Sequence, residues 1–353
     1  MRVKKDFALR TIQNKIFRQL CNTSAALVLA ITTVFLNSAD VMACASCGCT
    51  LSSDWENTQF SYTPGLKLDL RYDYINQNKL WSGSKSISPT AASQVIVNGN
   101  PNEVEQYTIN NYLTLGIDYS MSHDWGVNIQ VPYIDRKHST LGMGSDGFTP
   151  VPGGGQYESH TKSIGDVKVI GRYQGFTPQC SFGILYGVKL PTGSYTETGS
   201  STDPTAPGPV PIDRGLQPGT GTTDIILGAY YSNSIGQDWD YFASVLYQKA
   251  LDYKDQYKPG DGVNLNAGLR YAGFSVFAPI VQLNFREVRH DEGDNADQYN
   301  TGGTLLYFSP GITASISTHV SVYVFAQVPI YQYVEGVQLV PSFTSTVGVR
   351  YSF

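Results

Sequence analysis

Long apolar runs are missing from the 353-residue sequence, in which no stretch of about twenty uncharged apolar residues occurs. This absence excludes a bundle of transmembrane helices, and hydrophobic residues make up only 41% of the chain. Basic residues are also scarce, with 24 Lys and Arg against 29 Asp and Glu. The acidic balance argues against a nucleic acid as partner, because a surface that binds nucleic acid needs an excess of positive charge.

Histidine is scarce too, and the five histidines are scattered over predicted turns and loops. His290 and Asp291 form one adjacent pair of a base and an acid, in an acidic stretch. Nucleophilic catalysis needs a nucleophile and a base that share one site, and the sequence shows no convincing pair of serine and histidine. We therefore predict that the protein is not an enzyme.

Tyrosine (24) and glycine (35) are abundant, and the last stretch, residues 337–353, shows a clear alternation. One face carries Phe343, Val347, Val349, Tyr351 and Phe353, and the other carries Thr344, Thr346, Gly348, Arg350 and Ser352. A period of two predicts a strand whose two faces lie in different media. A strand of an outer-membrane barrel, with lipid on one side and a polar lumen on the other, has this pattern. We expect the aromatic Phe353 to be an assembly signal for the barrel-assembly machinery.

The same alternation recurs about twelve times, as an outer-membrane barrel requires. The runs lie near residues 66–74, 113–119, 125–131, 167–173, 182–190, 225–231, 241–247, 263–271, 276–285, 305–312, 320–330 and 343–353. Short connections alternate with long ones rich in Gly, Pro, Ser and Asp, at residues 76–103, 137–163, 191–221, 252–262 and 287–302. The sequence therefore predicts an all-β fold, a transmembrane antiparallel up-and-down β-barrel of about 12 strands with short periplasmic turns and long extracellular loops. Pro132 and Pro279 are predicted to mark β-bulges.

The residues before the first run predict export. Basic residues precede an apolar run at residues 25–36, and small residues suited to cleavage follow near residues 41–45. We predict a signal peptide at residues 1–43, a Cys-rich periplasmic head and linker at residues 44–63, and the barrel at residues 64–353. The predicted location is the outer membrane of a Gram-negative bacterium.

Cys44, Cys47 and Cys49 lie close together at the predicted mature N-terminus, and Cys180 stands alone. Disulfide pairing in an oxidising periplasm is one interpretation. A thiolate site for a soft metal, Cu or Zn, is a second, and lipidation of Cys44 is a third. Haem attachment is disfavoured because no His follows in a C-x-x-C-H pattern. Apart from Cu or Zn at this cluster, no cofactor is expected.

Charged residues fall on the face that the alternation assigns to the lumen. The cations are Lys67, Arg71, Lys168, Arg172, Lys189, Arg270, Arg286 and Arg350, and the anions are Asp69, Asp73, Asp118, Asp166 and Asp224. Inward placement is required whatever the function, because a charge that faces lipid is costly. One interpretation is a ladder of cross-strand ion pairs that fills the interior. The other is a permeation path that favours small anions, because inward cations exceed inward anions.

Four segments carry a resemblance to a known family: residues 131–136 (VPYIDR), 164–173 (IGDVKVIGRY), 187–193 (GVKLPTG) and 216–231 (LQPGTGTTDIILGAYY). They resemble the outer-membrane transporter family of the MetA pathway of phenol degradation. The similarity covers residues 64–353 and rests on several short motifs. It implies an outer-membrane barrel that moves small compounds, aromatic ones among them. The Cys-rich head is not part of this pattern.

The sequence thus predicts a porin-like barrel that passes or binds small solutes, either small organic compounds or anions. One alternative is a metal-related outer-membrane component in which Cys44, Cys47 and Cys49 bind a soft metal. Another is a structural barrel for a partner protein. The expected partners are outer-membrane lipid and lipopolysaccharide, the barrel-assembly machinery and a small solute.

Overall fold

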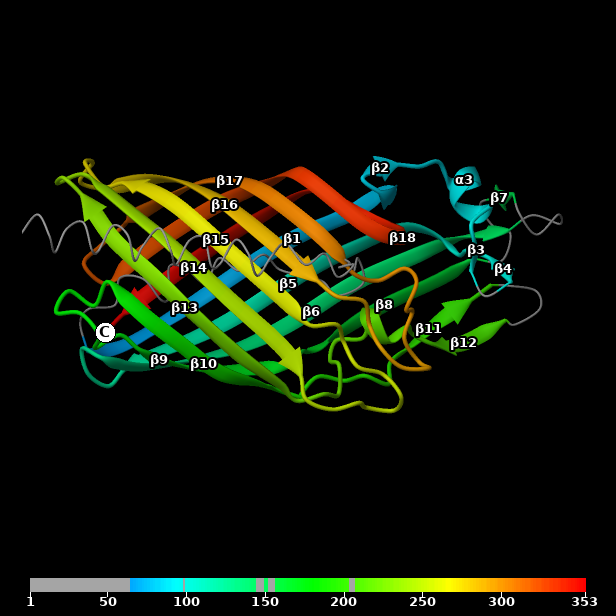
Figure 1. Cartoon of the computed structure of the whole chain (residues 1–353), viewed down its shortest axis with the longest axis horizontal. Helices are drawn as coiled ribbons and strands as arrows, with labels where there is room; N and C mark the ends of the chain where they lie inside the picture. The colour runs from blue at the N-terminus through cyan, green and yellow to red at the C-terminus, as the bar shows by residue number, and fades with distance from the viewer. Residues whose placement is uncertain (1–63, 98, 144–148, 152–155, 203–206) are drawn as a thin grey trace, which may run out of the picture. The chain divides into compact units, whose positions relative to one another are not determined.

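The computed structural model describes residues 64–97, 99–143, 149–151, 156–202 and 207–353. Figure 1 shows the long strands β1 (Gly65–Gly83), β5 (Val104–Ser120), β6 (Trp125–Met143), β8 (Tyr157–Ile164), β9 (Val167–Tyr173), β10 (Phe182–Leu190), β13 (Asp224–Ile235), β14 (Trp239–Ala250), β15 (Gly262–Tyr271), β16 (Phe277–Val288), β17 (Gly303–Ser315) and β18 (Val320–Ser352). Shorter elements are β2 (Lys85–Ser86), α3 (Pro89–Ser93), β3 (Ile96–Val97), β4 (Asn100–Pro101), β7 (Pro150–Val151), β11 (Thr198–Ser201), β12 (Gly208–Pro211) and the 3₁₀ helix η1 (Arg214–Leu216). No helix in the described ranges is long and apolar enough to cross a membrane. The predicted signal peptide and head, with Cys44, Cys47 and Cys49, lie outside the described residues.

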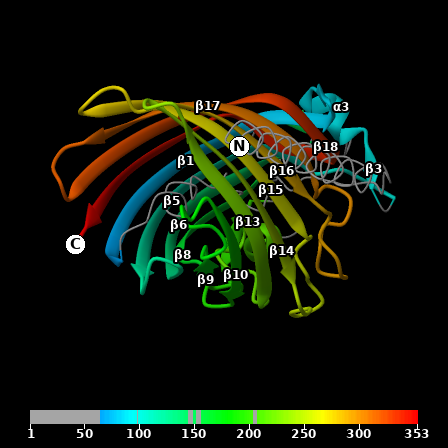
Figure 2. The same ribbon diagram turned by 60° about the vertical axis from the view of Figure 1, so that its left-hand side comes forward.

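The long strands form a closed antiparallel barrel (Figures 1 and 2). Neighbours pair in the order β6, β5, β1, β18, β17, β16, β15, β14, β13, β10 and β9, and the pairing of β9 with β6 closes the ring. β8 and β9 are one strand broken at Gly165 and Asp166, because both pair with β6. β18 makes two passes, since residues 321–334 pair with β17 and residues 334–352 pair with β1. The chain reverses near Gly336, whose φ is +53°. The barrel therefore has twelve passes, which confirms the predicted fold class.

Apolar side chains cover the outside of the barrel. Leu70 and Tyr72 on β1 and Val347 and Val349 on β18 are all exposed, as the alternation predicts. Aromatic rings gather at the end with the short turns, in contacts that link Trp125, Tyr173, Phe176 and Phe182, link Trp239, Tyr271, Phe274 and Phe277, and join Tyr351 to Phe353. An apolar band with an aromatic boundary is the exterior of an outer-membrane protein.

The β-bulge predicted at Pro279 is wrong, because Pro279 lies in regular register with β17. Pro132 lies in regular register with β5, but on its other side the pairing shifts by one residue, between Gln130 with Lys168 and Tyr133 with Ile164. The carbonyl of Pro132 accepts a hydrogen bond from Gly165 N at 2.8 Å. The N–H and C=O of one residue point to the same side of a strand, so the missing N–H of Pro132 faces the break between β8 and β9 and leaves the ladder with β5 intact. The pairing of β16 with β15 begins at Ile280, one residue after Pro279. The missing N–H of Pro279 therefore costs no hydrogen bond in that ladder.

Two connections predicted as loops contain much strand. β1 runs on to Gly83 within residues 76–103, and β6 and β8 occupy most of residues 137–163. Residues 136–140 are all polar, so the alternation that identifies a lipid-facing strand ends although the backbone pairing continues. The barrel wall therefore extends beyond the apolar band at the extracellular end. The register shifts between β1 and β18 and between β5 and β6 lie in this extension.

Aromatic and aliphatic side chains fill the periplasmic half of the lumen. One buried cluster consists of Phe242, Ile280, Tyr323 and Phe325, and another consists of Ile170, Leu185, Ile226 and Tyr230. Inward-facing glycines make room for the rings, since a Cβ on Gly183, Gly268, Gly311 or Gly348 would overlap Tyr230, Phe242, Phe325 or Tyr323, respectively. This half of the barrel is packed like a protein core.

Replacing Gly311 with alanine is expected to destabilise the barrel by about 1–3 kcal/mol, the usual cost of overpacking. The added methyl group would overlap the ring of Phe325 and lie 2.7 Å from Val324 O. Gly262→Ala on β15 is the matched control, because the nearest atoms there lie 3.8 Å from the new Cβ. Urea unfolding, followed by heat-modifiable migration on gels, should show a lower midpoint for Gly311→Ala alone. Equal midpoints would contradict tight packing at this position.

Candidate functional site

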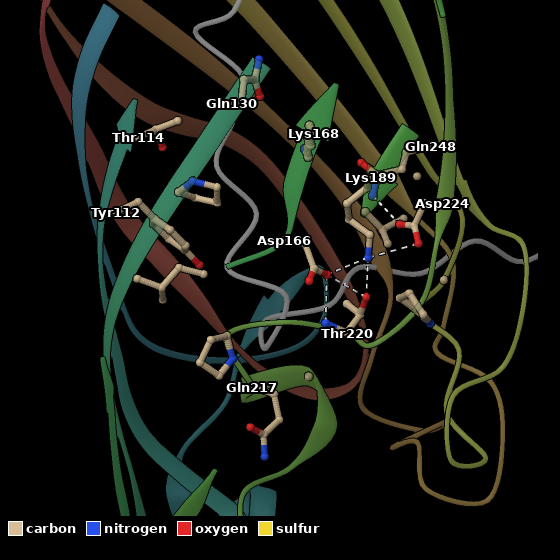
Figure 3. Close-up of a pocket in the computed structure, with 18 of the residues that line it drawn as sticks. Tyr112, Thr114, Gln130, Asp166, Lys168, Lys189, Gln217, Thr220, Asp224 and Gln248 are labelled. Carbon is tan, nitrogen blue, oxygen red and sulfur yellow. Dashed lines mark hydrogen bonds and ion pairs between the residues drawn. The ribbon is translucent and has the colours of Figure 1, made fainter. Parts of the chain in front are cut away.

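A cavity of about 220 Å³ lies in the lumen (Figure 3). Its basic side chains are Arg71, Arg136, Lys168, Lys189, Arg214 and Arg286, and its acidic ones are Asp166 and Asp224. The apolar part of the lining includes Tyr112, Ile134, Leu246, Tyr257 and the prolines Pro132, Pro218 and Pro259. The cavity thus combines an excess of positive charge with apolar and aromatic surface.

Lys189 lies between the two acidic residues of the cavity (Figure 3). Its Nζ is 3.0 Å from Asp166 Oδ2 and 3.1 Å from Asp224 Oδ1. The same Nζ donates to the hydroxyl oxygens of Thr220 and Thr222. Lys189 on β10 and Asp224 on β13 are register partners, so the alternation points both side chains inward next to each other. All three charged groups are buried, and they join β10, β13 and the start of β9.

Asp166 also holds the connection between β10 and β13. It accepts hydrogen bonds from Gly193 N, Thr220 N and Thr220 Oγ1, each at 3.0 Å. Gly193 and Gly219 approach so closely that a Cβ on Gly193 would lie 2.8 Å from Gly219 Cα. The two ends of this connection, residues 191–194 and 217–223, therefore cross at the break between β8 and β9.

Arg136 fixes the middle of the same connection to the barrel wall. Its Nε donates to Asn110 Oδ1 at 2.6 Å, and its Nη2 donates to Tyr112 Oη at 2.7 Å. Its Nη1 donates to Gly215 O at 3.2 Å and to Gln217 O at 3.4 Å. Because Gly215 and Gln217 line the cavity, η1 and the residue after it form one of its walls.

Arg214 ties η1 to a second extracellular connection. Its guanidinium lies over the rings of Tyr195 and Tyr257, at 4.8 and 4.9 Å from their centroids. Its Nη2 donates to Thr220 O at 2.7 Å and to Lys254 O at 3.3 Å. Stacking between two rings holds a guanidinium in place while it remains charged.

Two arginines of the cavity have no acidic partner in the described part of the chain: neither Arg136 nor Arg286 forms a salt bridge with a carboxylate there. Arg286 Nη1 donates to Asn264 Oδ1 at 2.8 Å. Its buried Nε has no hydrogen-bond partner among the described residues. An arginine in a protein stays protonated, so the cavity keeps a net positive charge that attracts anions.

Other predicted lumen charges lie close to one another in pairs. Arg71 is 2.9 Å from Asp73, Arg172 is 3.2 Å from Asp118, and Arg350 is 3.4 Å from Asp69. Arg270 Nε is 3.0 Å from Asp240, a residue that the sequence reasoning missed. Asp240 and Arg270 are register partners. Extending the alternation of inward and outward residues by one residue along β14 would therefore have identified Asp240. Lys67 lies near Asp118, and Lys168 lines the cavity.

Sequence reasoning also missed that the four family-like segments meet in space. Pro132 and Arg136 come from the first, Asp166 and Lys168 from the second, Lys189 from the third, and Gln217, Pro218, Thr220 and Asp224 from the fourth. All contribute to the cavity lining. The Gly and Pro residues in these segments are the available signal, because glycine allows close backbone approach and proline is tolerated where a ladder is interrupted.

Carboxyl groups gather at the extracellular mouth. Glu103, Glu105, Asp213, Asp291 and Asp297 line a second cavity of about 80 Å³. Glu105 lies on the part of β5 beyond the apolar band, and its Oε2 accepts a hydrogen bond from Leu339 N at 3.1 Å. Burial, and next the charge of Glu103, raise the pKa of the Glu105 carboxyl to about 8.

We expect the mouth to loosen as the pH rises. A carboxyl whose pKa is raised by folding stabilises the fold below its ordinary pKa of 4.5, and this contribution is lost as the pH passes through about 8. Hydrogen exchange should therefore show lower protection factors at pH 9 than at pH 6 for the amides of β5 and β18 around Glu105, other than Leu339, whose own bond favours the ionised carboxylate. Glu105→Gln should remove most of this dependence, because the amide does not ionise. A protection factor that increases with pH in the native protein would contradict the expectation.

Comparison with known proteins gives matches in structure only, since no protein-family model and no curated protein sequence matches the chain. The barrel is similar to the crystal structure of an outer membrane channel from Pseudomonas putida F1, with 12% identity and a TM-score of 0.56 over 83% of this chain and 98% of that one. Weaker matches are the CymD monoaromatic hydrocarbon channel (10% identity, TM-score 0.48, 90% and 98% of the two chains) and the toluene transporter TodX of P. putida (10%, 0.45, 83% and 91%). The first match supports the fold, an outer-membrane barrel.

Proposed function

We propose that the barrel binds and passes small organic anions through its basic cavity. The observation that carries this proposal is the pair Arg136 and Arg286, two cations without a carboxylate partner among the described residues, in a partly apolar cavity of the lumen. A carboxylate or phenolate in the cavity could pair with the guanidinium of Arg286, which lines it and has no carboxylate partner among those residues. Uptake of an anion would thus offset charge that the protein leaves uncompensated.

The size of the cavity supports a solute with a single ring. An apolar cavity of about 150 Å³ holds benzene, so about 220 Å³ leaves room for a ring and a carboxylate. Tyr112, Tyr257 and Ile134 offer surface for the ring, and the arginines offer donors for the charged group. The resemblance of four segments to the phenol-degradation transporter family also favours aromatic solutes.

Ion selectivity in planar bilayers tests the proposal. Under a KCl gradient the reversal potential should show a preference for anions. Arg286→Met should move the reversal potential toward zero, because it removes an uncompensated cation from the cavity. The control is Lys85→Met, which removes one positive charge from the exposed strand β2 and should leave selectivity unchanged. A preference for cations, or an Arg286→Met variant identical to the native protein, would overturn the proposal.

The packed periplasmic half favours a second candidate, a structural barrel that serves a partner protein. The buried clusters around Phe325 and Tyr230 fill the lumen there. The two functions differ in one readout: a structural barrel should carry no current and should not release benzoate from loaded liposomes. A barrel that passes anions should carry current and should release benzoate, once side chains of the periplasmic half move aside.

A further inference from the structure

Three potential metal ligands lie together at the periplasmic end, outside the lumen. His123 and Asp124 belong to the turn between β5 and β6, and Cys180 belongs to the turn between β9 and β10. Cys180 Sγ is 3.0 Å from His123 Nδ1, and His123 Nδ1 is 3.9 Å from Asp124 Oδ1. One sulfur, one nitrogen and one oxygen donor thus lie within 4.8 Å of one another.

Hydrogen bonds hold the two turns in this arrangement. Gln174 N donates to Asp124 O at 2.9 Å, and Gln174 Nε2 donates to His123 O at 2.8 Å. Gln174 is itself fixed, because its Oε1 accepts a hydrogen bond from the buried hydroxyl of Tyr230 at 2.5 Å. Gly175 lets the turn that contains Asp124 come close, since a Cβ at Gly175 would lie 2.9 Å from Asp124 Cγ. These contacts fix the backbone of both turns, and so the positions from which the three side chains extend.

The backbone at Cys180 is unusual for a residue with a side chain. Its φ is +50°, in the left-handed region that residues other than glycine, asparagine and aspartate seldom adopt. Cys180 N donates to Thr177 O at 2.9 Å, and Ser181 N donates to Thr177 Oγ1 at 2.9 Å, so the turn stabilises this conformation. The conformation directs the otherwise buried thiol toward His123.

We propose that Cys180, His123 and Asp124 bind a zinc-like divalent cation at the periplasmic rim. Thiolate, imidazole and carboxylate are the three ligand types that Zn²⁺ takes in proteins. Zn–S and Zn–N distances of about 2.3 and 2.0 Å in a tetrahedron place sulfur and nitrogen about 3.5 Å apart, so the Cys180–His123 pair, now at 3.0 Å, needs to widen only slightly. His123 and Asp124 are about half exposed, which opens the fourth position to water. Binding releases the thiol proton to solvent, and no redox step is involved.

Titration with Co²⁺ tests the site, because a thiolate ligand gives a sulfur-to-cobalt charge-transfer band and a tetrahedral site gives visible absorption. The reduced full-length protein in detergent, free of oxygen, should bind one Co²⁺ with both features, and Zn²⁺ should abolish them. The bands should disappear in Cys180→Ser and in His123→Ala, and Co²⁺ should bind more weakly to Asp124→Asn. His319→Ala is the matched control, since His319 also lies in an exposed turn, between β17 and β18, and it should keep the bands.

The cysteines near the N-terminus need their own variant, because they are thiolates too. A Cys44→Ser, Cys47→Ser, Cys49→Ser triple variant should keep the bands if the rim site binds the metal. Loss of the bands in the triple variant together with their retention in Cys180→Ser would overturn the proposal. A native protein without any charge-transfer band would also overturn it and leave a plain thiol–imidazole hydrogen bond. Heat-modifiable migration on gels checks that each variant is folded.

Discussion

Lys189→Met should lower the free energy of unfolding of the barrel by about 3–5 kcal/mol, the cost of removing one partner from a buried ion pair. Methionine fills similar space but leaves the buried carboxylates of Asp166 and Asp224 facing each other without a cation. Asp166 would remain hydrogen-bonded to Gly193 and Thr220. The main loss is therefore the attraction between the Lys189 ammonium group and the two carboxylates.

Lys168→Met is the control for Lys189→Met, because Lys168 is the register partner of Lys189 on β9, faces the same cavity and is only partly buried. Unfolding in urea should show a small change for this variant. Combining Lys189→Met with Asp166→Asn and Asp224→Asn should recover much of the loss, because neutral amides do not repel each other. If Lys189→Met and Lys168→Met destabilise the barrel equally, the central role of Lys189 is wrong.

Phe242→Ala combined with Phe325→Ala should turn a weakly conducting barrel into an open one. Both rings are buried in the same cluster of the lumen, and they stand against Gly268 and Gly311. Two alanines would therefore leave a gap that no neighbouring side chain fills. Besides the apolar Ile280, the gap would meet Gln282, which lies beside Phe242 at Gly268, and the Tyr323 hydroxyl that donates to Asp69, so water should enter it. Single-channel current in planar bilayers should increase severalfold.

The matched control for this double variant is Phe277→Ala with Phe308→Ala. These two phenylalanines lie on the neighbouring strands β16 and β17 but are exposed on the lipid side. The control removes the same groups and should leave the current unchanged. Each buried Phe→Ala change also costs about 3–5 kcal/mol, so the recordings need molecules that show heat-modifiable migration. An unchanged current in the folded double variant would show that another part of the lumen closes the barrel.

The strands of the barrel were predictable because lipid and lumen impose opposite polarity on alternate residues. On β1, the alternation of Leu70 and Tyr72 with Asp69, Arg71 and Asp73 predicted the facing that the structure shows. The prediction ended where the wall leaves the membrane. Lys137 and the polar residues after it continue as β6, but neither face meets lipid there, so the alternation carries no signal.

The candidate site was predictable only in part. The alternation of the sequence alone placed Lys189, Asp166 and Asp224 on the inward face. It did not show that Lys189 would contact both carboxylates. That contact depends on the break at Gly165 and on the crossing of Gly193 with Gly219, which brings residues far apart in sequence together. The sequence did not predict that the rings of Tyr230 and Phe242 point into the lumen, because we expected the lumen to be polar. A glycine on the adjacent strand next to each ring was the signal for them.

Solute selectivity in liposomes tests the central claim most directly, with two solutes that share one ring and differ in charge. Liposomes containing the barrel should take up benzoate faster than benzylammonium at the same concentration, in excess of the rates through empty liposomes. Arg286→Met should reduce this difference, because it removes from the cavity lining a cation that has no carboxylate partner among the described residues. Uptake of benzylammonium as fast as benzoate, or uptake of neither above the empty liposomes, would contradict a cavity selective for small organic anions.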